Sequence, residues 1–124
     1  MHPIRTLVVA GFVLTGCIAA APPEATPDPA VAAKLRQLSG GDACSDRIAG
    51  ALTAAGITAD RITDYDLAPL ASGGRRNSGI RRNLQRQAWL KLAGGGSVVV
   101  QYEPSSCRIS ILYARDGAVL PTAG

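Results

Sequence analysis

The spacing of apolar residues changes halfway along the chain, from intervals typical of helices to the alternation typical of strands. In the first half, Val31, Leu35 and Leu38 recur four and three residues apart. Asp28-Pro29 precedes this run as an N-cap followed by a proline at the first helical position, and a Ser-Gly-Gly sequence follows it. The pattern therefore predicts a short first helix between these two signals.

A second helix is predicted to begin with Asp42 as its N-cap and to end at Gly56, because a glycine followed by an apolar residue is a common helix stop. One face of this helix collects small and apolar side chains at helical spacing. These residues are Cys44, Ile48, Ala51, Leu52 and Ala55. We expect that face to be buried.

In the second half, apolar and polar residues alternate around two turns that contain glycine or proline, which is typical of an antiparallel meander. Strands are predicted at about Gln87 to Ala93, Val98 to Glu103 and Cys107 to Arg115, and Ile57 to Leu67 is a candidate for an earlier one. The strand faces that the helices should cover carry Val98, Val100 and Tyr102, and then Cys107, Ile109, Ile111 and Tyr113. The predicted fold class is α+β, with two N-terminal helices packed on a three- or four-stranded antiparallel meander in a small single domain.

Trp89, the only tryptophan, is expected on the opposite side of its strand from Ala88 and Leu90, together with Lys91. In that orientation the ring either stacks on a sugar or a partner, or covers the edge of the sheet. We favour the second interpretation, because an amphipathic ring often covers partly exposed apolar surface.

The N-terminal residues have the build of a secretory signal peptide, with Arg5 as the basic region and an apolar run from Leu7 to Leu14. The uncharged stretch continues only to Ala21 before two prolines, somewhat short of the roughly 20 residues that a membrane-spanning helix needs. We therefore expect an export leader rather than a permanent span.

The leader is followed by Leu14-Thr15-Gly16-Cys17, which resembles the lipobox of bacterial lipoproteins. The resemblance implies that residues 1–16 are a signal peptide and that Cys17 is the lipidated first residue of the mature protein. Two or three acyl chains make a stable membrane anchor. The next residue is Ile18 and not aspartate, which by the same resemblance implies the outer membrane, facing the periplasm, if the source is Gram-negative. The alternative is ordinary cleavage after Ala19 or Ala20, which would release a soluble secreted protein.

This resemblance is confined to the lipobox, and no family is recognised for the domain behind it. Residues 18–29 contain four prolines and no aromatic residue, which predicts an extended linker. The expected organisation is therefore a signal peptide at 1–16, a lipidated cysteine with a Pro/Ala-rich tether at 17–29, one α+β domain at 30–120 and a tail at 121–124.

With Cys17 taken by lipid, Cys44 and Cys107 remain, and each falls on the apolar face of its predicted element. In an oxidising envelope we expect them to form a disulfide, which would close a loop of about 63 residues and contribute up to about 4 kcal/mol. The alternative is a pair of independent buried thiols.

The residues that commonly perform catalysis are scarce. The only histidine, His2, lies in the leader, and no persuasive pair of catalytic carboxylates is present. Asp60, Asp64 and Asp66 are close in sequence, but their spacing matches no calcium-binding loop, and we interpret Asp64 and Asp66 as solvent-facing strand positions. We expect a protein that is not an enzyme, with no catalytic residue, no cofactor and no metal site.

Positive charge is concentrated in one segment, which holds five of the 13 lysines and arginines. The candidate anion-binding residues are Arg75, Arg76, Arg81, Arg82 and Arg86. Arginine binds phosphate in a bidentate manner, but an exported domain meets little nucleic acid and no basic-aromatic recognition signature accompanies the segment. The expected partners are the membrane, through the lipid anchor, and an anionic envelope polymer or another envelope protein. The alternative is a solvated loop whose arginines pair with Asp60, Asp64 or Asp66.

Together these features predict a small lipoprotein of the cell envelope of non-catalytic, binding or interaction type. It would contact anionic polymers or headgroups through the arginine-rich loop. Two other functions stay open: an inhibitor of an envelope hydrolase, and a structural envelope protein with no small-molecule ligand.

Overall fold

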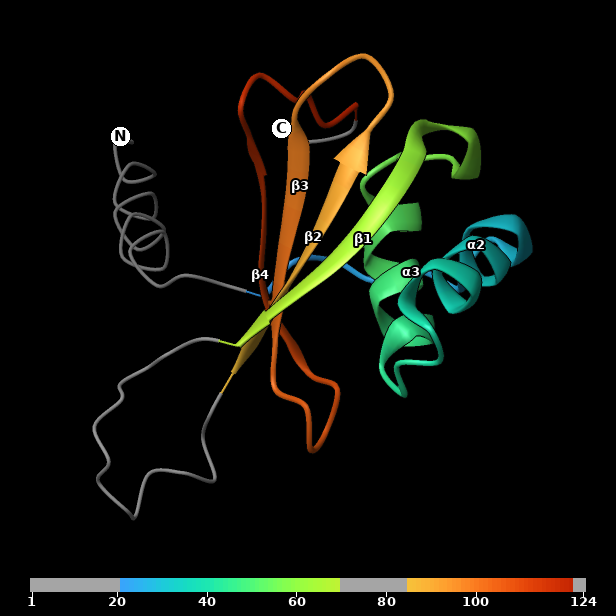
Figure 1. Cartoon of the computed structure of the whole chain (residues 1–124). Coiled ribbons are helices and arrows are strands. Elements are labelled where there is room, and N and C mark those ends of the chain that lie inside the picture. Colours follow the sequence, from blue (N-terminus) through green and yellow to red (C-terminus); the bar gives the residue numbers. More distant parts are fainter. Residues whose placement is uncertain (1–20, 70–84, 122–124) are drawn as a thin grey trace, which may run out of the picture.

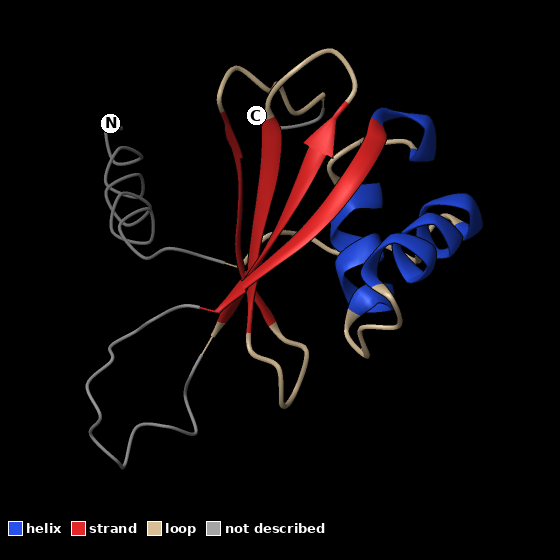
Figure 2. Cartoon of the chain, in the orientation of Figure 1, coloured by secondary structure: helices blue, strands red, loops and turns tan. Residues whose placement is uncertain are grey.

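The computed structural model describes residues 21–69 and 85–121, which form two helices followed by a four-stranded antiparallel sheet (Figure 1). The elements are α2 (Pro29–Ser39), α3 (Ser45–Ala54), the 3-10 turn η2 (Ala59–Arg61), β1 (Ile62–Pro69), β2 (Arg86–Leu92), β3 (Ser97–Tyr102) and β4 (Ile109–Arg115). The strands lie in the order β1-β2-β3-β4, and both helices cover the same face of the sheet (Figure 2). The predicted α+β fold is confirmed. The sheet has four strands, because the candidate earlier strand is present as β1.

Helix α2 begins and ends where the sequence signals indicate. Asp28 accepts a hydrogen bond from the backbone N–H of Ala30 at 3.0 Å, and Pro29 is the first helical residue. Gly40 adopts a left-handed φ of 71° at the other end, a conformation that glycine reaches without steric cost. Val31 and Leu35 are buried and turn the helix toward the core.

Helix α3 begins at Ser45, two residues later than an N-cap at Asp42 predicts, so Cys44 and not Asp42 is the N-cap residue. Instead Asp42 closes the turn before the helix, accepting the N–H of Cys44 on its carboxylate and the N–H of Ser45 on its carbonyl. The helix ends at Ala54, and Ile57 N–H bonds back to the Leu52 carbonyl across Gly56. The predicted face of this helix is buried, with Ala55 partly so.

The core lies between the helices and the inner face of the sheet, which we define as the face turned toward α2 and α3. Ile48 and Leu52 of α3 and Leu90, Val100 and Tyr102 of the sheet are fully buried in it. An ion pair between Arg36 and Asp46, 2.8 Å apart, joins the two helices on the exposed side.

Strand β4 departs from strict alternation, and the predicted burial of Ile111 and Tyr113 on the helix-covered face is wrong. Ile109 pairs with Tyr102, but Ile111 pairs with the neighbouring Gln101, so Ser110 is an extra residue in the ladder. Such a bulge moves every later side chain to the other face of the sheet. Ile111 is accordingly 43% exposed, and Leu112 contacts the core in its place.

The last part of the predicted tether is bound to α3. Arg47 grips Glu24 with two nitrogen–oxygen contacts of 2.7 and 3.2 Å, and the N–H of Ala25 donates to the Gly50 carbonyl. A Cβ at Gly50 would lie only 2.6 Å from the carbonyl oxygen of Ala25, so the chain can approach this closely because the helix has a glycine there. The ordered unit therefore includes residues from Glu24 onward.

Across 21–69 and 85–121, no helix combines the length and the apolar character needed to cross a membrane.

Candidate functional site

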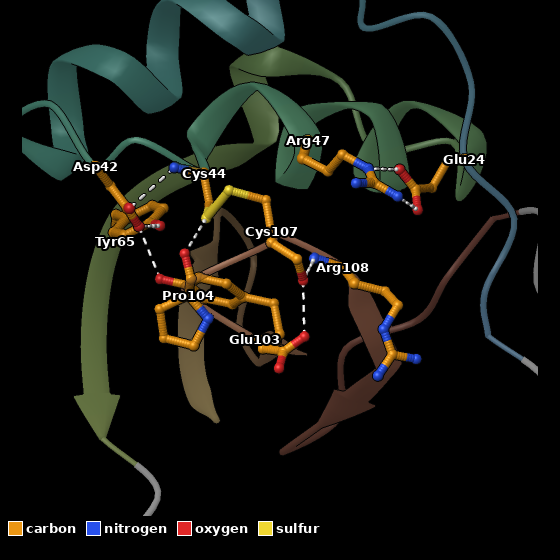
Figure 3. Close-up of a disulfide and its surroundings, with 11 residues drawn as sticks. Glu24, Asp42, Cys44, Arg47, Tyr65, Glu103, Pro104, Cys107 and Arg108 are labelled. Atoms are coloured by element: carbon orange, nitrogen blue, oxygen red, sulfur yellow. Dashed lines mark hydrogen bonds and ion pairs between the residues drawn. A yellow bond between two sulfur atoms is a disulfide. The ribbon is translucent and has the colours of Figure 1, made fainter. Parts of the chain in front are cut away.

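The predicted disulfide between Cys44 and Cys107 is present, with a Cα–Cα distance of 5.2 Å (Figure 3). It joins the start of α3 to the turn between β3 and β4. Cys107 lies in this turn and not in the last strand as predicted, because its φ of 63° breaks the extended conformation. The disulfide therefore closes one end of the domain by linking the helical layer to the sheet.

The turn that carries Cys107 is held by its own hydrogen bonds. The backbone N–H of Cys107 donates to the Glu103 carbonyl at 2.7 Å, and the N–H of Glu103 donates to the Arg108 carbonyl at 3.0 Å. The Ser106 hydroxyl donates to the Glu103 carboxylate at 2.7 Å and accepts the N–H of Arg108. The disulfide thus joins two ordered segments.

Beside the disulfide, one carboxylate collects hydrogen bonds from three parts of the fold. The hydroxyls of Tyr65 in β1 and Tyr102 in β3 both donate to Oδ2 of Asp42 at 2.8 Å, while Oδ1 accepts the N–H of Cys44 at 3.1 Å. Both tyrosines are buried, so their hydroxyls need a partner inside the protein. We call Asp42, Tyr65 and Tyr102 the carboxylate cluster.

The carboxylate cluster has a defined charge state near neutral pH. Burial acts to raise the pKa of Asp42, but the hydrogen bonds from Cys44, Tyr102 and Tyr65 and the charge of Arg86 outweigh it and hold the pKa below its ordinary value. Burial and the neighbouring carboxylate raise the pKa of Tyr102 to about 12 and raise that of Tyr65 as well. Asp42 is therefore an anion, and both tyrosines are protonated donors.

The cluster is a structural joint. Both carboxylate oxygens of Asp42 already accept hydrogen bonds, and the hydroxyls of Tyr65 and Tyr102 already donate to that carboxylate. None of these three side chains is therefore free to attack a substrate. The sequence analysis missed this cluster. The available signal was the presence of two tyrosines at inner-face strand positions, since a buried hydroxyl requires an acceptor.

Of the predicted anion-binding residues, Arg75, Arg76, Arg81 and Arg82 lie outside the described residues, as does the lipidation candidate Cys17. Arg86 is the first residue of β2 and is exposed, between Pro69 and Tyr102 in the strand register. Its charge helps to lower the pKa of Asp42, and its hydrogen bond opposes the rise in the pKa of Tyr102. The carboxylate cluster thus interacts with Arg86, the last residue of the arginine-rich segment and the first of β2.

The aspartates considered as a cation site are separated in the fold. Asp60 lies in η2 and accepts a hydrogen bond from the Thr58 hydroxyl at 2.6 Å, whereas Asp64 and Asp66 are exposed on β1. Within the ranges 21–69 and 85–121, no group of three or more histidines, cysteines and acids could hold a metal ion.

Trp89 lies on the face of the sheet away from the helices, as predicted from its position relative to Ala88 and Leu90. Its indole N–H donates to the side chain of Gln87 at 3.1 Å, and the Arg115 guanidinium lies 4.9 Å from the ring centroid. The arginine therefore covers the ring, which supports a packing role over stacking on a free sugar.

Comparison with known proteins adds no relative. No protein-family model, curated protein or solved structure matches the chain. Its function is therefore inferred from its own residues and their geometry.

Proposed function

We propose that the chain is a small lipoprotein of the bacterial envelope whose α+β domain binds a partner and does not catalyse a reaction. The proposed contact is the arginine-rich segment from Arg75 to Arg86, and the proposed partners are anionic envelope polymers, phosphate-bearing headgroups or another envelope protein. The leader and the lipobox resemblance at Cys17 support the address. The Cys44–Cys107 disulfide supports it too, because structural disulfides persist in oxidising compartments.

One observation carries the binding part of the proposal: the pairing of Pro69 with Arg86, two described residues on either side of residues 70–84. Pro69 and Arg86 are paired across β1 and β2, so the chain leaves the sheet and returns to it at a single place. The carboxylate cluster faces Arg86 at this root, and the disulfide lies beside the cluster. Five arginines in the sequence between Arg75 and Arg86 are suited to a charge-dependent contact with phosphate.

The absence of histidine from residues 3–124 and the saturated state of Asp42 support a binding role over hydrolysis. General acid–base chemistry needs a group that can exchange a proton near the working pH. Both Asp42 and Tyr102 have pKa values shifted away from neutrality, and each is engaged by the other. The arrangement favours a stable scaffold.

The test replaces Arg75, Arg76, Arg81 and Arg82 by serine in a chain that also carries Cys17→Ser, so that no acyl chain binds the vesicle by itself. We expect the parent to sediment with anionic phospholipid vesicles and to be released by salt, because such contacts are screened over about 10 Å at 0.1 M. We expect the four-serine variant to lose most of this binding.

The matched control removes the same charge elsewhere on the domain, by serine at Lys34, Arg36, Arg61 and Arg108. This control should keep most of the binding if the segment is the contact, and circular dichroism should show both variants folded. Equal loss in both variants would mean that net charge alone drives binding, and unchanged binding in the four-serine variant would overturn the proposal.

A further inference from the structure

Helix α3 holds the segment that precedes α2, which we call the strap and define as residues 24–28. Three contacts fix it: Arg47 with the Glu24 carboxylate at 2.7 Å, the Gly50 carbonyl with the Ala25 N–H at 3.1 Å, and the Thr53 hydroxyl with the Asp28 N–H at 3.0 Å. The three helix positions are three residues apart, so each lies next to the following one on the helix surface. The strap is therefore fixed along most of the length of α3.

The strap runs in the same direction as α3. Its first residue, Glu24, is held at Arg47 near the start of the helix (Figure 3), and its last, Asp28, is held at Thr53 near the end. The chain on the N-terminal side of the strap therefore reaches the domain where α3 begins, beside Cys44. We call this the entry end of the domain.

The entry end also carries the disulfide and the strand ends that adjoin the arginine-rich segment. Cys44 is three residues before Arg47 and is bonded to Cys107 in the β3–β4 turn. Beside that turn, one row of the register crosses all four strands, through Ile109, Tyr102, Arg86 and Pro69. The tether thus joins the domain at the same end at which Pro69 and Arg86 lie.

Docking of the strap shortens the tether between the proposed lipid anchor and the domain. Seven residues, 17–23, precede the strap, and at up to 3.6 Å each they span at most about 25 Å. The seven residues of β4 are themselves about 23 Å long. Turning the far end of the sheet to the membrane would therefore stretch the tether to nearly its full length, whereas the entry end reaches the membrane with slack.

Two exposed arginines at the entry end are available to an outside partner. Arg86 and Arg108 form no ion pair within residues 21–69 and 85–121. The nearby acids are already engaged: Glu24 by Arg47, Glu103 by the Ser106 hydroxyl, and Asp42 by its three donors. Phosphate is a preferred partner of a free guanidinium, because it accepts two parallel hydrogen bonds.

We infer that the strap holds the entry end against the bilayer that anchors Cys17, so that Arg86 and Arg108 meet the headgroup phosphates of that same bilayer. The inference rests on the proposed function and selects one of its partners, the lipid headgroups. Attraction between exposed charges acts over about 10 Å at 0.1 M salt, so it favours the end that the short tether keeps near the surface.

The experiment compares the two ends of the acylated chain in vesicles that carry dansyl-labelled headgroups, by energy transfer from a single tryptophan. Trp89→Phe removes the native tryptophan. In that background Ser105→Trp marks the β3–β4 turn at the entry end, and Ala93→Trp marks the β2–β3 turn at the far end, both exposed. The two turns are about 20 Å apart, so we expect at least about twofold more efficient transfer from Ser105→Trp.

Gly50→Ala releases the strap without weakening α3. The added Cβ would lie 2.6 Å from the Ala25 carbonyl oxygen, so the strap must move, while alanine is a better helix residue than glycine. The reach from Cys17 then grows from about 25 to about 43 Å, and we expect the difference in transfer between the two ends to fall by about half or more.

A second variant and a control accompany this change. Arg47→Gln with Thr53→Val removes two of the strap contacts without adding volume, and it should reduce the difference between the ends in the same way. The matched control is Arg36→Gln, which removes the exposed ion pair with Asp46 between the helices and should keep the full difference.

Equal transfer from the two ends of the parent chain, or stronger transfer from the far end, would overturn the inference and leave the lipoprotein proposal standing. It would also be overturned if both strap variants, folded by circular dichroism, kept the full difference, because the strap would then not set the orientation. A native chain that carries no acyl chain would overturn the proposed address and this inference together, and its intact mass shows that case separately.

Discussion

On β3, Val98 and Val100 point toward the helices, whereas Val99 between them points to the face of the sheet turned away from α2 and α3, the outer face, and all three are buried. The inner pair belongs to the common core beneath α2 and α3. Val99 lies outside that core, and its cross-strand neighbours are Trp89 and Tyr113. Val98 and Val100 thus belong to the thick apolar core beneath the helices, whereas Val99 belongs to a thin apolar layer on the other face, which is bordered by charged residues.

This comparison separates what holds the domain together from what it can present to others. The inner side also contains the disulfide and the carboxylate cluster, both of which join the helical layer to the sheet. The outer side carries the exposed charges of Asp64, Asp66, Lys91 and Arg115. Changes on the inner side should therefore cost more stability than changes on the outer side.

The largest expected effect comes from removing the cross-link with Cys44→Ser and Cys107→Ser together. The bridge spans 63 residues, and we expect a loss of about 3 to 4 kcal/mol in the free energy of unfolding, because the unfolded chain regains the freedom of that loop. Urea titration measures it. Reductant should lower the parent to the same midpoint and leave the double variant unaffected; equal midpoints for parent and variant would refute the prediction.

The next largest effect is expected for Asp42→Asn, which should lower the free energy of unfolding by about 1 to 3 kcal/mol. An amide cannot accept hydrogen bonds from two buried hydroxyls and a backbone N–H as a carboxylate does. The pKa of Asp42 lies below its ordinary value of 3.8, so its contribution is present above that pH and is lost as the pH falls through the folded pKa. The parent should therefore lose stability in acid more steeply than the variant.

Tyr102 acts at the opposite end of the pH range. Its pKa is raised from 10.0 to about 12, so its contribution is present below pH 10 and is lost as the pH rises toward 12. Thermal unfolding from pH 2 to 11 measures both the loss of stability in acid, from Asp42, and the loss in alkali, from Tyr102. Identical pH profiles for the parent and Asp42→Asn would contradict the assigned role of the cluster.

The valines of β3 give a matched pair that tests the two layers directly. Val100→Ala should cost about 2 kcal/mol, from the lost burial and the cavity left behind, because the core surrounds it on all sides. Val99→Ala should cost less than about 1 kcal/mol, since the thin outer layer can relax into the space. Equal losses, measured by urea titration, would mean that the two faces are equally deep.

The smallest effect concerns the outer face alone. Arg115→Ala should lower the free energy of unfolding by about 0.5 to 1 kcal/mol, the usual contribution of a guanidinium over a partly exposed indole. Trp89 is the only tryptophan, so its fluorescence should shift toward the emission of a more hydrated ring. Arg108→Ala is the control and should leave the emission unchanged; the same shift in both variants would count against the contact.

The sequence predicted those parts of the fold that depend on local periodicity. Asp28-Pro29 and the glycine at 40 mark α2 correctly, and the alternation predicts β2 and β3 to within about one residue. The disulfide was predictable because Cys44 and Cys107 both follow apolar patterns, although Cys107 lies in a turn.

The remaining features depend on contacts that no local pattern encodes. The bulge at Ser110 exchanges the faces of Ile111 and Leu112, and one extra residue leaves no mark in a row of apolar side chains. The carboxylate cluster joins residues that are 23 and 60 positions apart from Asp42. The only sequence signal for the contact between Ala25 and Gly50 was a glycine inside a helical pattern, since such a glycine often marks a place where another segment packs close to the helix.

The proposal of a tethered, oxidised envelope domain is tested most directly by the intact mass of the native protein extracted from membranes. We predict a chain that begins at Cys17 and carries two or three acyl chains on that residue. Its mass should increase by two hydrogen atoms when the Cys44–Cys107 disulfide is reduced. A chain that begins at Ala20 or Ala21, recovered from the soluble fraction without lipid, would contradict it.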